Sequence, residues 1–160
     1  MTLAYVALGA NLGEPLITIQ SAISALDALP ATTRTATSSL YRTAPVGLKN
    51  QPDFINAVVA LETQLTPAEL LEQLFVIEAR FGRRRSVANA PRTLDLDLLL
   101  HGATRLATPT LTLPHPRMHQ RAFVLAPLAE IAPNATIPAL GSVATLLATC
   151  ADQAIARLPA

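Results

Sequence analysis

The order of apolar segments predicts an α+β fold, because the pattern runs strand, helix, strand, strand, helix, strand over residues 3–100. This is the split βαββαβ order of ferredoxin-like folds, in which helices cover an antiparallel sheet. Cap and turn residues separate the segments. At 160 residues, 51% of them apolar, the chain is long enough to bury its own core. We therefore expect one domain over residues 1–160, with the part after residue 100 as a C-terminal extension.

The first half of the pattern begins with a strand at residues 3–8, which are apolar on both faces as in a central strand. Residues 9–13 then turn into a helix with Pro15 at its first position. A strand over residues 32–42 and a polar loop over 43–52 lead to a third strand over 53–63. We expect the buried stripe of the helix to consist of Leu16, Ile19, Ile23 and Leu26.

The second half has the clearest helix start, in which Thr66 is the N-cap, Pro67 the first helical residue and Glu69 the partner in a capping box. Gly82 is expected to end this helix, and a fourth strand follows over residues 93–100. Its buried face is expected to consist of Leu70, Leu71, Leu74, Ile77 and Phe81.

The C-terminal extension contains a proline-rich stretch over residues 109–116 and a helix near 121–131 that we expect to be broken or restarted at Pro127. A short helix follows Ser142. The uncharged stretch over 131–151 has membrane-spanning length, but its prolines and hydroxyl residues favour a loop and a core helix.

Charge and cysteine content exclude several classes of protein. The net charge of +1 gives no strong field for nucleic acid or anionic lipid. Cys150 is the only cysteine, so an intramolecular disulfide scaffold is excluded and a buried thiol is expected. The N-terminus lacks the features of a signal peptide. We expect a cytoplasmic monomer that binds neither nucleic acid nor membranes.

An acidic pair is the first candidate for chemistry. Asp95 and Asp97 lie two residues apart in the fourth strand, so their carboxylates point to one face, roughly 6–7 Å apart. The leucines at 94, 96, 98 and 100 are expected to face the core and fix the register. Such a pair suits Mg²⁺ that is also bound to phosphates. From these residues alone, a metal site and a structural pair bonded to arginines are equally supported.

Arginines flank this strand in the sequence. An arginine cluster beside an acidic pair is typical of a magnesium–nucleotide site, although a solvated loop is the usual fate of such a charge run. His115 lies between two prolines and is a candidate phosphate contact. The arginines are Arg83, Arg84, Arg85 and Arg92 before the strand and Arg117 and Arg121 after it.

A possible pocket for a flat ligand lies on the third strand. Phe54 and Asn56 share one face, and together they offer an aromatic plane and an amide with donors and an acceptor. From spacing alone, a core phenylalanine beside a solvent-facing asparagine is the favoured interpretation.

Several motifs, in order along nearly the whole chain, together resemble the hydroxymethyldihydropterin pyrophosphokinase family. They are VALGANLG at residues 6–13, SLYRTAP at 39–45, DFIN at 53–56, PRTLDLD at 91–97, LPHP at 113–116 and RAF at 121–123. The PRTLDLD run is the most specific of them.

The resemblance implies an enzyme that transfers pyrophosphate from ATP to 6-hydroxymethyl-7,8-dihydropterin in folate biosynthesis, with two Mg²⁺ ions. It implies that Asp95 and Asp97 bind the metals and, with Arg83 and Arg92, form the catalytic set. The residues implied to bind ATP are Arg85, Arg92, Thr112, His115 and Arg121. Those implied to form the pterin pocket are Thr43, Ala44, Val46, Phe54, Asn56 and Phe123.

Two loops, over residues 43–52 and 83–91, are the expected lids of this site. Family members often carry a basic residue and a tryptophan where this sequence has Ala88 and Asn89. Two other functions are weighed against the pyrophosphokinase. An RNA-binding module needs sheet aromatics and a basic face, which this chain lacks. A metal-dependent phosphohydrolase would release phosphate from ATP without any pterin.

Overall fold

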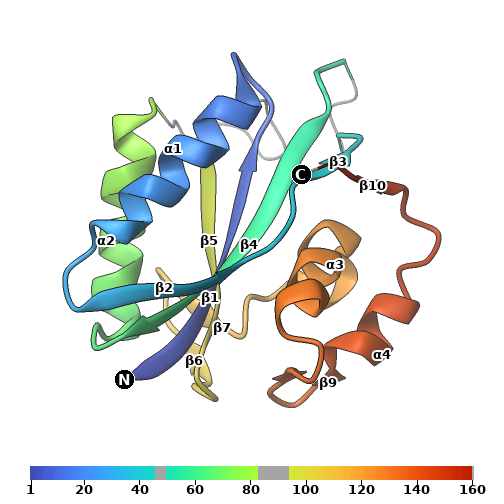
Figure 1. Cartoon of the computed structure of the whole chain (residues 1–160). Coiled ribbons are helices and arrows are strands. Elements are labelled where there is room, and N and C mark those ends of the chain that lie inside the picture. Colours follow the sequence, from blue (N-terminus) through green and yellow to red (C-terminus); the bar gives the residue numbers. More distant parts are fainter. Residues whose placement is uncertain (46–49, 83–93, 160) are drawn as a thin grey trace.

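The computed structural model describes residues 1–45, 50–82 and 94–159, and is organised around a six-stranded antiparallel sheet (Figure 1). Five strands run in the order β10-β3-β4-β1-β5, and β2 pairs with β4 next to β3 along the same edge. This arrangement confirms the predicted fold class. The strands are β1 (Thr2–Ala10), β2 (Thr32–Thr37), β3 (Tyr41–Thr43), β4 (Phe54–Thr63), β5 (Asp95–His101) and β10 (Ile155–Arg157).

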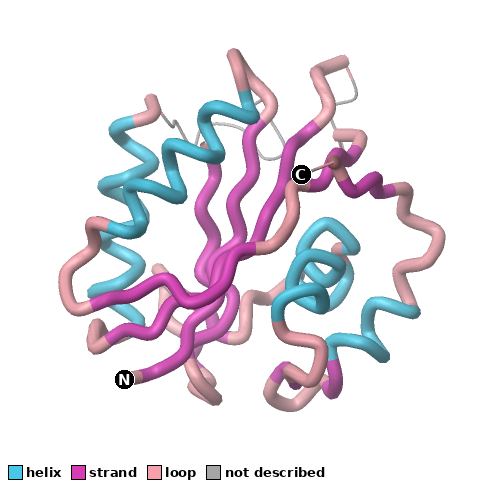
Figure 2. Tube along the Cα trace, in the orientation of Figure 1, coloured by secondary structure: helices cyan, strands magenta, loops and turns pink. Residues whose placement is uncertain are grey.

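Helices cover both faces of the sheet (Figure 2). The helices α1 (Pro15–Asp27) and α2 (Pro67–Arg80) pack on one face, and α3 (Ala122–Ile131) and α4 (Val143–Ala148) lie on the other. Each face has its own cluster of buried side chains. The extension also contains a one-turn helix (Met118–Gln120) and the small strands β6 (Leu106–Ala107), β7 (Thr112–Leu113), β8 (Thr136–Ile137) and β9 (Gly141–Ser142).

The start and end signals of α2 are confirmed. The Thr66 side chain accepts a hydrogen bond from the Glu69 N–H at 3.2 Å, and the Thr66 N–H donates to the Glu69 carboxylate at 2.9 Å. Gly82 follows the helix with φ of +76°, a conformation that favours glycine. Of the predicted buried face, Leu70, Leu74 and Ile77 are buried, whereas Leu71 and Phe81 are half-buried.

The first helix begins at Pro15 as predicted, but its buried stripe is displaced. Leu16 is 44% exposed, so its predicted burial is wrong. Ile19 and Leu26 are buried as predicted, Ile23 is half-buried, and Ala22 is buried in addition. The small side chain of Ala22 lets the helix approach the sheet along a stripe that the larger residues alone do not define.

The predicted strand over residues 32–42 is divided into β2 and β3. The chain bends at Ser38, whose backbone N–H donates to the Val58 C=O and whose hydroxyl accepts from the Val58 N–H, both at 2.9 Å. Because Ser38 satisfies the backbone of Val58 in this way, both short strands can pair with β4 in succession.

Pro127 does not break α3, which is a single helix. Pro127 itself is buried, together with Leu125 and Leu128 on the same helix. A proline costs a helix about 3 kcal/mol. Burial of this apolar face offsets the loss, since a fully buried leucine contributes about 1.5–3 kcal/mol.

The side chains of β5 alternate between the two faces of the sheet as far as Leu99, and the alternation is then interrupted. Leu94, Leu96 and Leu98 are buried against α1 and α2, as predicted. Leu100 packs with Leu99 in the cluster on the opposite face, because the pairing with β1 shifts between Tyr5 and Val6. This irregularity places Leu99 and Leu100 on the same face, so the prediction that Leu100 shares the buried face of Leu94, Leu96 and Leu98 is wrong.

The extension otherwise follows the prediction. Cys150 is buried, and Ser142 caps α4 by accepting a hydrogen bond from the Thr145 N–H at 3.1 Å. None of the helices in the described part of the chain has both the length and the apolar composition needed to span a bilayer.

Candidate active site

The site is organised around Gly9, near the end of the central strand β1. Gly9 pairs with Asn56 of β4 on one side and with Asp95 of β5 on the other. Asp97 pairs with Ala7, two residues earlier on β1. Because side chains alternate between faces, all these positions lie on the face that α3 covers.

A cleft of about 990 Å³ opens between these strand ends and the start of α3. Its volume is near the upper end of the range for small-molecule sites. Most of the predicted site residues therefore come together in one place. Those lining the cleft are Thr43, Ala44, Phe54, Asn56, Asp95, Asp97, His115, Arg121 and Phe123.

One wall of the cleft is formed by β3 and β4. Asn56 is only 5% exposed, and its amide donates a hydrogen bond to the Thr43 hydroxyl at 2.8 Å. Half-buried Phe54 is the partner of Thr43 across the two strands. A Cβ at Gly9 would lie 3.2 Å from the Asn56 side-chain oxygen, so glycine leaves room for the Asn56 amide against β1. The bonded, buried amide excludes the interpretation of Asn56 as solvent-facing.

The opposite wall is the start of α3. The Arg121 guanidinium carbon lies 5.4 Å from the centre of the Phe123 ring. A guanidinium at this distance is attracted to the face of an aromatic ring. This wall therefore combines an aromatic ring with a positive charge that lies over it.

The acidic pair is partly exposed at the cleft, on β5. Within residues 1–45, 50–82 and 94–159, no group of three or more His, Cys, Asp or Glu side chains is arranged to hold a metal ion. Two carboxylates are nevertheless sufficient for Mg²⁺, which takes its remaining ligands from phosphate and water oxygens. Asp95 and Asp97 thus fit a metal that is bound together with a phosphate-containing substrate.

His115 is held neutral. Burial lowers its pKa, and the positive charges of Arg121 and Arg117 lower it further against the opposing effect of Asp95, to about 4. Its Nδ1 atom accepts a hydrogen bond from the Arg117 backbone N–H at 3.2 Å. The neutral ring therefore carries its proton on Nε2 and presents a hydrogen-bond donor there.

A second cavity of about 230 Å³ adjoins the cleft, with Asp97, His115 and Pro116 lining both. Thr112, which the main cleft does not include, lies here. Apolar side chains of α2, Leu71 and Phe75, contribute to its wall. Asp97 and the neutral histidine thus stand at the junction of the two cavities, and Asp95 lines only the main cleft.

Four predicted site residues, Val46, Arg83, Arg85 and Arg92, lie outside the described residues. So do Ala88, Asn89, residues 46–49 of the first expected lid and the whole of the second.

A family model for 7,8-dihydro-6-hydroxymethylpterin-pyrophosphokinase (HPPK) matches residues 5–133. The chain belongs to the HPPK family. This confirms the family that the sequence motifs predict, and it makes the chain an enzyme that transfers a diphosphate group. The RNA-binding and phosphohydrolase alternatives are thereby set aside.

Two relatives in the HPPK family match the chain almost end to end. A 2-amino-4-hydroxy-6-hydroxymethyldihydropteridine pyrophosphokinase from Pseudomonas aeruginosa is 48% identical over 155 residues, 97% of this chain and 96% of the relative. An enzyme of the same name from Haemophilus influenzae is 41% identical over 158 residues, 99% of each.

The structure of an HPPK-DHPS from Plasmodium falciparum with pteroate has a TM-score of 0.72 at 15% identity. It matches 92% of this chain, which spans 43% of that longer protein. This likeness concerns the fold.

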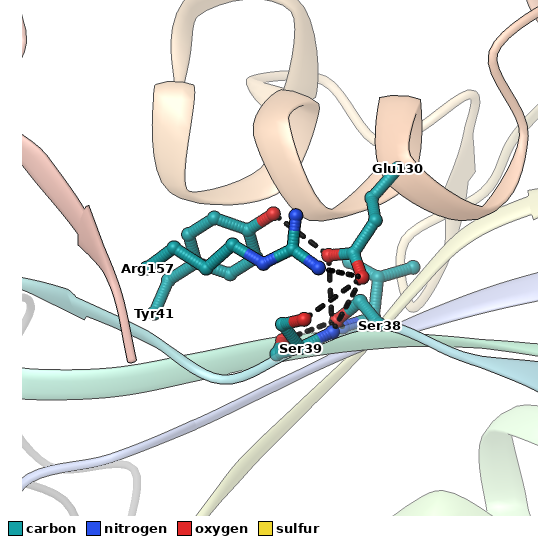
Figure 3. A network of polar contacts seen from close by, with 6 residues as sticks. Ser38, Ser39, Tyr41, Glu130 and Arg157 are labelled. Atoms are coloured by element: carbon teal, nitrogen blue, oxygen red, sulfur yellow. Dashed lines mark hydrogen bonds and ion pairs between the residues drawn. The ribbon is translucent and has the colours of Figure 1, made fainter. Parts of the chain in front are cut away.

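A polar network joins the two walls of the HPPK cleft (Figure 3). Glu130 of α3 accepts hydrogen bonds from the Tyr41 hydroxyl at 2.7 Å, the Ser39 hydroxyl at 2.9 Å and the Ser39 N–H at 3.0 Å. Arg157 of β10 donates to the same carboxylate at 3.2 Å. Helix α3, which carries Phe123, is in this way bonded to β3, which carries Thr43.

Sequence reasoning missed several residues that line the cleft, among them Gly9 and Gln153. Gly9 was expected only as part of a turn, although the presence of Asn56 and Asp95 on neighbouring strands could have identified its role. Gln153 precedes β10 and reaches the cleft from the far end of the chain. No local motif marks Gln153, because its position depends on how the extension folds back.

Proposed function

We propose that the cleft is where this chain transfers pyrophosphate from ATP to the hydroxymethyl group of 6-hydroxymethyl-7,8-dihydropterin, releasing AMP, as a step of folate biosynthesis. One observation carries the proposal. The central residue Gly9 stands between a buried amide, Asn56, and a member of the acidic pair, Asp95. An amide that recognises a heterocycle and an acidic pair that suits magnesium are thus on neighbouring strands of one surface.

The pterin is assigned to the part of the cleft between β4 and α3. Phe54 and Phe123 would stack on the two sides of the ring system. Asn56 would bind its polar edge, with Thr43 holding the amide in place through the 2.8 Å hydrogen bond. The family resemblance adds Ala44 and Val46 to this pocket.

ATP is assigned to the second cavity. Leu71 and Phe75 supply apolar surface for the base, and Thr112 lies beside them. The phosphates would then extend past Asp97 and His115 into the main cleft, since these two residues line both cavities.

We assign two Mg²⁺ ions to Asp95 and Asp97, where they would supply positive charge to the phosphate oxygens. The residues of the chain then have separate tasks. Arg121 neutralises phosphate charge, and His115 donates a hydrogen bond from Nε2 without adding charge. The family resemblance gives Arg83, Arg85 and Arg92 further phosphate contacts. Positioning and electrostatics supply the acceleration when the pterin oxygen attacks the β-phosphorus.

The test is a product analysis with ATP, Mg²⁺ and reduced hydroxymethylpterin. We expect AMP to form in step with pterin consumption, and no AMP to form without pterin or with EDTA. ADP as the pterin-dependent product would refute pyrophosphoryl transfer. Nucleotide cleavage at an equal rate without pterin would indicate a hydrolase.

We further propose that residues 1–160 act as one domain and that the protein is a cytoplasmic monomer. The cleft supports the monomer, because side chains from one chain form both of its walls.

A further inference from the structure

The segment between α4 and β10 reaches the start of α3 through one side chain. The Gln153 amide oxygen accepts a hydrogen bond from the Ala122 N–H at 2.9 Å, and its amide nitrogen donates to the Gln120 C=O at 2.8 Å. These two groups belong to the peptide units on either side of Arg121. A single side-chain amide therefore holds the backbone both before and after Arg121.

Arg121 stands at a point where the backbone needs such support. It is the N-cap of α3, with extended φ and ψ of −123° and 110°, and no side chain of the usual capping type bonds there. The Arg121 C=O accepts hydrogen bonds from the N–H groups of Val124 and Leu125 in the first turn of the helix, at 3.1 and 3.0 Å. Its N–H makes a longer bond of 3.4 Å to Met118. Gln153 satisfies a helix-terminal N–H from 31 residues away in the sequence and ties it to the preceding turn.

Gln153 is itself anchored on both sides. Its own N–H donates to the Cys150 C=O at 3.0 Å, in the turn that follows α4. Two residues later, β10 begins with Ile155, which pairs with Thr43 of β3. The segment is thus attached to the protein before and after the glutamine, which limits the positions that its amide can take.

We propose that Gln153 is a positioning residue for Arg121: by holding the two flanking peptide units, it directs the guanidinium toward the phosphates of ATP. The inference rests on the proposed function, in which Arg121 contacts those phosphates. It gives the C-terminal segment a part in nucleotide binding that is exerted through Arg121.

The experiment compares Gln153→Ala, Gln153→Glu and Arg121→Ala with the wild type. Glutamate keeps the acceptor for the Ala122 N–H but replaces the donor to the Gln120 carbonyl with a negative oxygen. Loss of hydrogen bonds of this kind corresponds to about a 5- to 30-fold effect. We expect a rise of about this size in KM for ATP for both Gln153 variants, with KM for the pterin changed less than about twofold. Asp152→Ala, a change at the exposed neighbour, is the control and should match the wild type.

The decisive measurement is the double variant Gln153→Ala with Arg121→Ala. If Gln153 acts through Arg121, removing the glutamine has no further effect once the arginine is gone, so the double variant should match Arg121→Ala within about twofold. Multiplying effects would overturn the proposal and indicate a general structural role. So would wild-type ATP affinity in Gln153→Ala, measured by titration with a non-hydrolysable analogue.

The failure of the proposed function is a separate outcome. If the wild type forms no pterin-dependent AMP, the reaction assignment fails. If it forms AMP but Arg121→Ala binds ATP normally, the role of Arg121 fails, and the role of Gln153 fails with it. Melting temperatures identify any variant that does not fold, in which case Gln153→Glu replaces Gln153→Ala in the double variant.

Discussion

The Glu130 carboxylate accepts the hydrogen bonds that connect α3 to Ser39 and to Tyr41 of β3. Glu130→Gln tests how much this connection stabilises the fold, because glutamine has nearly the same shape. Whichever way the glutamine amide turns, one carboxylate oxygen is replaced by an NH₂ group. The hydrogen bond donated by the Tyr41 hydroxyl at 2.7 Å, or those donated by the Ser39 hydroxyl at 2.9 Å and by Arg157 at 3.2 Å, then lose their acceptor.

The expected cost follows from these bonds. A hydrogen bond to a charged group contributes about 1.5–3 kcal/mol, and exposure reduces it. The Glu130 side chain is 22% exposed and that of Arg157 is 60% exposed, so Arg157 adds little. We expect Glu130→Gln to lower the free energy of unfolding by about 1–3 kcal/mol, which for a chain of this size lowers the melting temperature by about 2–10 °C.

The pH dependence gives this prediction a second test. Partial burial raises the pKa of Glu130, but hydrogen bonds from Tyr41 and Ser39 and the charge of Arg157 outweigh it, so the pKa lies below its ordinary value. A carboxylate with a lowered pKa stabilises the fold above its unfolded pKa of about 4.3, and that contribution is lost as the pH falls through the folded value. The difference between the wild type and Glu130→Gln should therefore shrink as the pH falls below about 4.

Urea unfolding at pH 7 and at decreasing pH measures both effects, with Glu72→Gln, an exposed change on α2, as the control. Equal stability of the wild type and Glu130→Gln at pH 7 would refute the reasoning. So would a difference that persists unchanged at pH 3, because it could not come from the ionised carboxylate.

Three further predictions concern the cleft itself. Asn56→Ala should weaken pterin binding by about 1–3 kcal/mol, because polar groups of the ligand lose their partner, and leave ATP binding nearly unchanged; equal losses by calorimetry would contradict the assignment. Asp97→Asn should abolish the dependence of ATP-analogue affinity on Mg²⁺ and reduce turnover by orders of magnitude, whereas near-normal turnover would exclude a metal ligand. His115 has a pKa lowered to about 4, so the folded state loses stability as the pH falls from 6.5 toward 4. His115→Gln should flatten this loss in unfolding curves, and an unchanged slope would show that the histidine is not held neutral.

The sequence predicts those parts of the fold that depend on local signals. The capping box at Thr66 and Glu69, the proline at the start of α1 and the glycine after α2 act over a few residues, and each is where the sequence places it. Burial on α1 was less predictable. A period of 3.6 residues identifies a face of a helix, but Ala22 rather than Leu16 lies against the sheet, because the contact depends on how closely the two elements approach.

In the candidate site, too, features set by local sequence could be predicted, whereas those set by contacts between distant segments could not. Asp95 and Asp97 lie on the same face because successive side chains of a strand point to opposite faces. Their separation by two residues was therefore enough to predict this. The shift after Leu98 and the continuity of α3 through Pro127 depend on packing between distant segments. Gln153 was not predictable for the same reason, since its partners are more than thirty residues away.

Because Gly9 pairs with Asn56 on one side and Asp95 on the other, the sheet fixes the distance between these two residues. Neighbouring strands lie about 4.8 Å apart, so the backbones at Asn56 and Asp95 are held roughly 10 Å apart across β1. Changes in loop length elsewhere leave this distance unaltered. A slip of β1 by one residue would instead carry Gly9 away from both partners at once and turn its side of the strand over. The distance between the amide of one strand and the carboxylate of the other is therefore a property of the sheet and not of the loops around it.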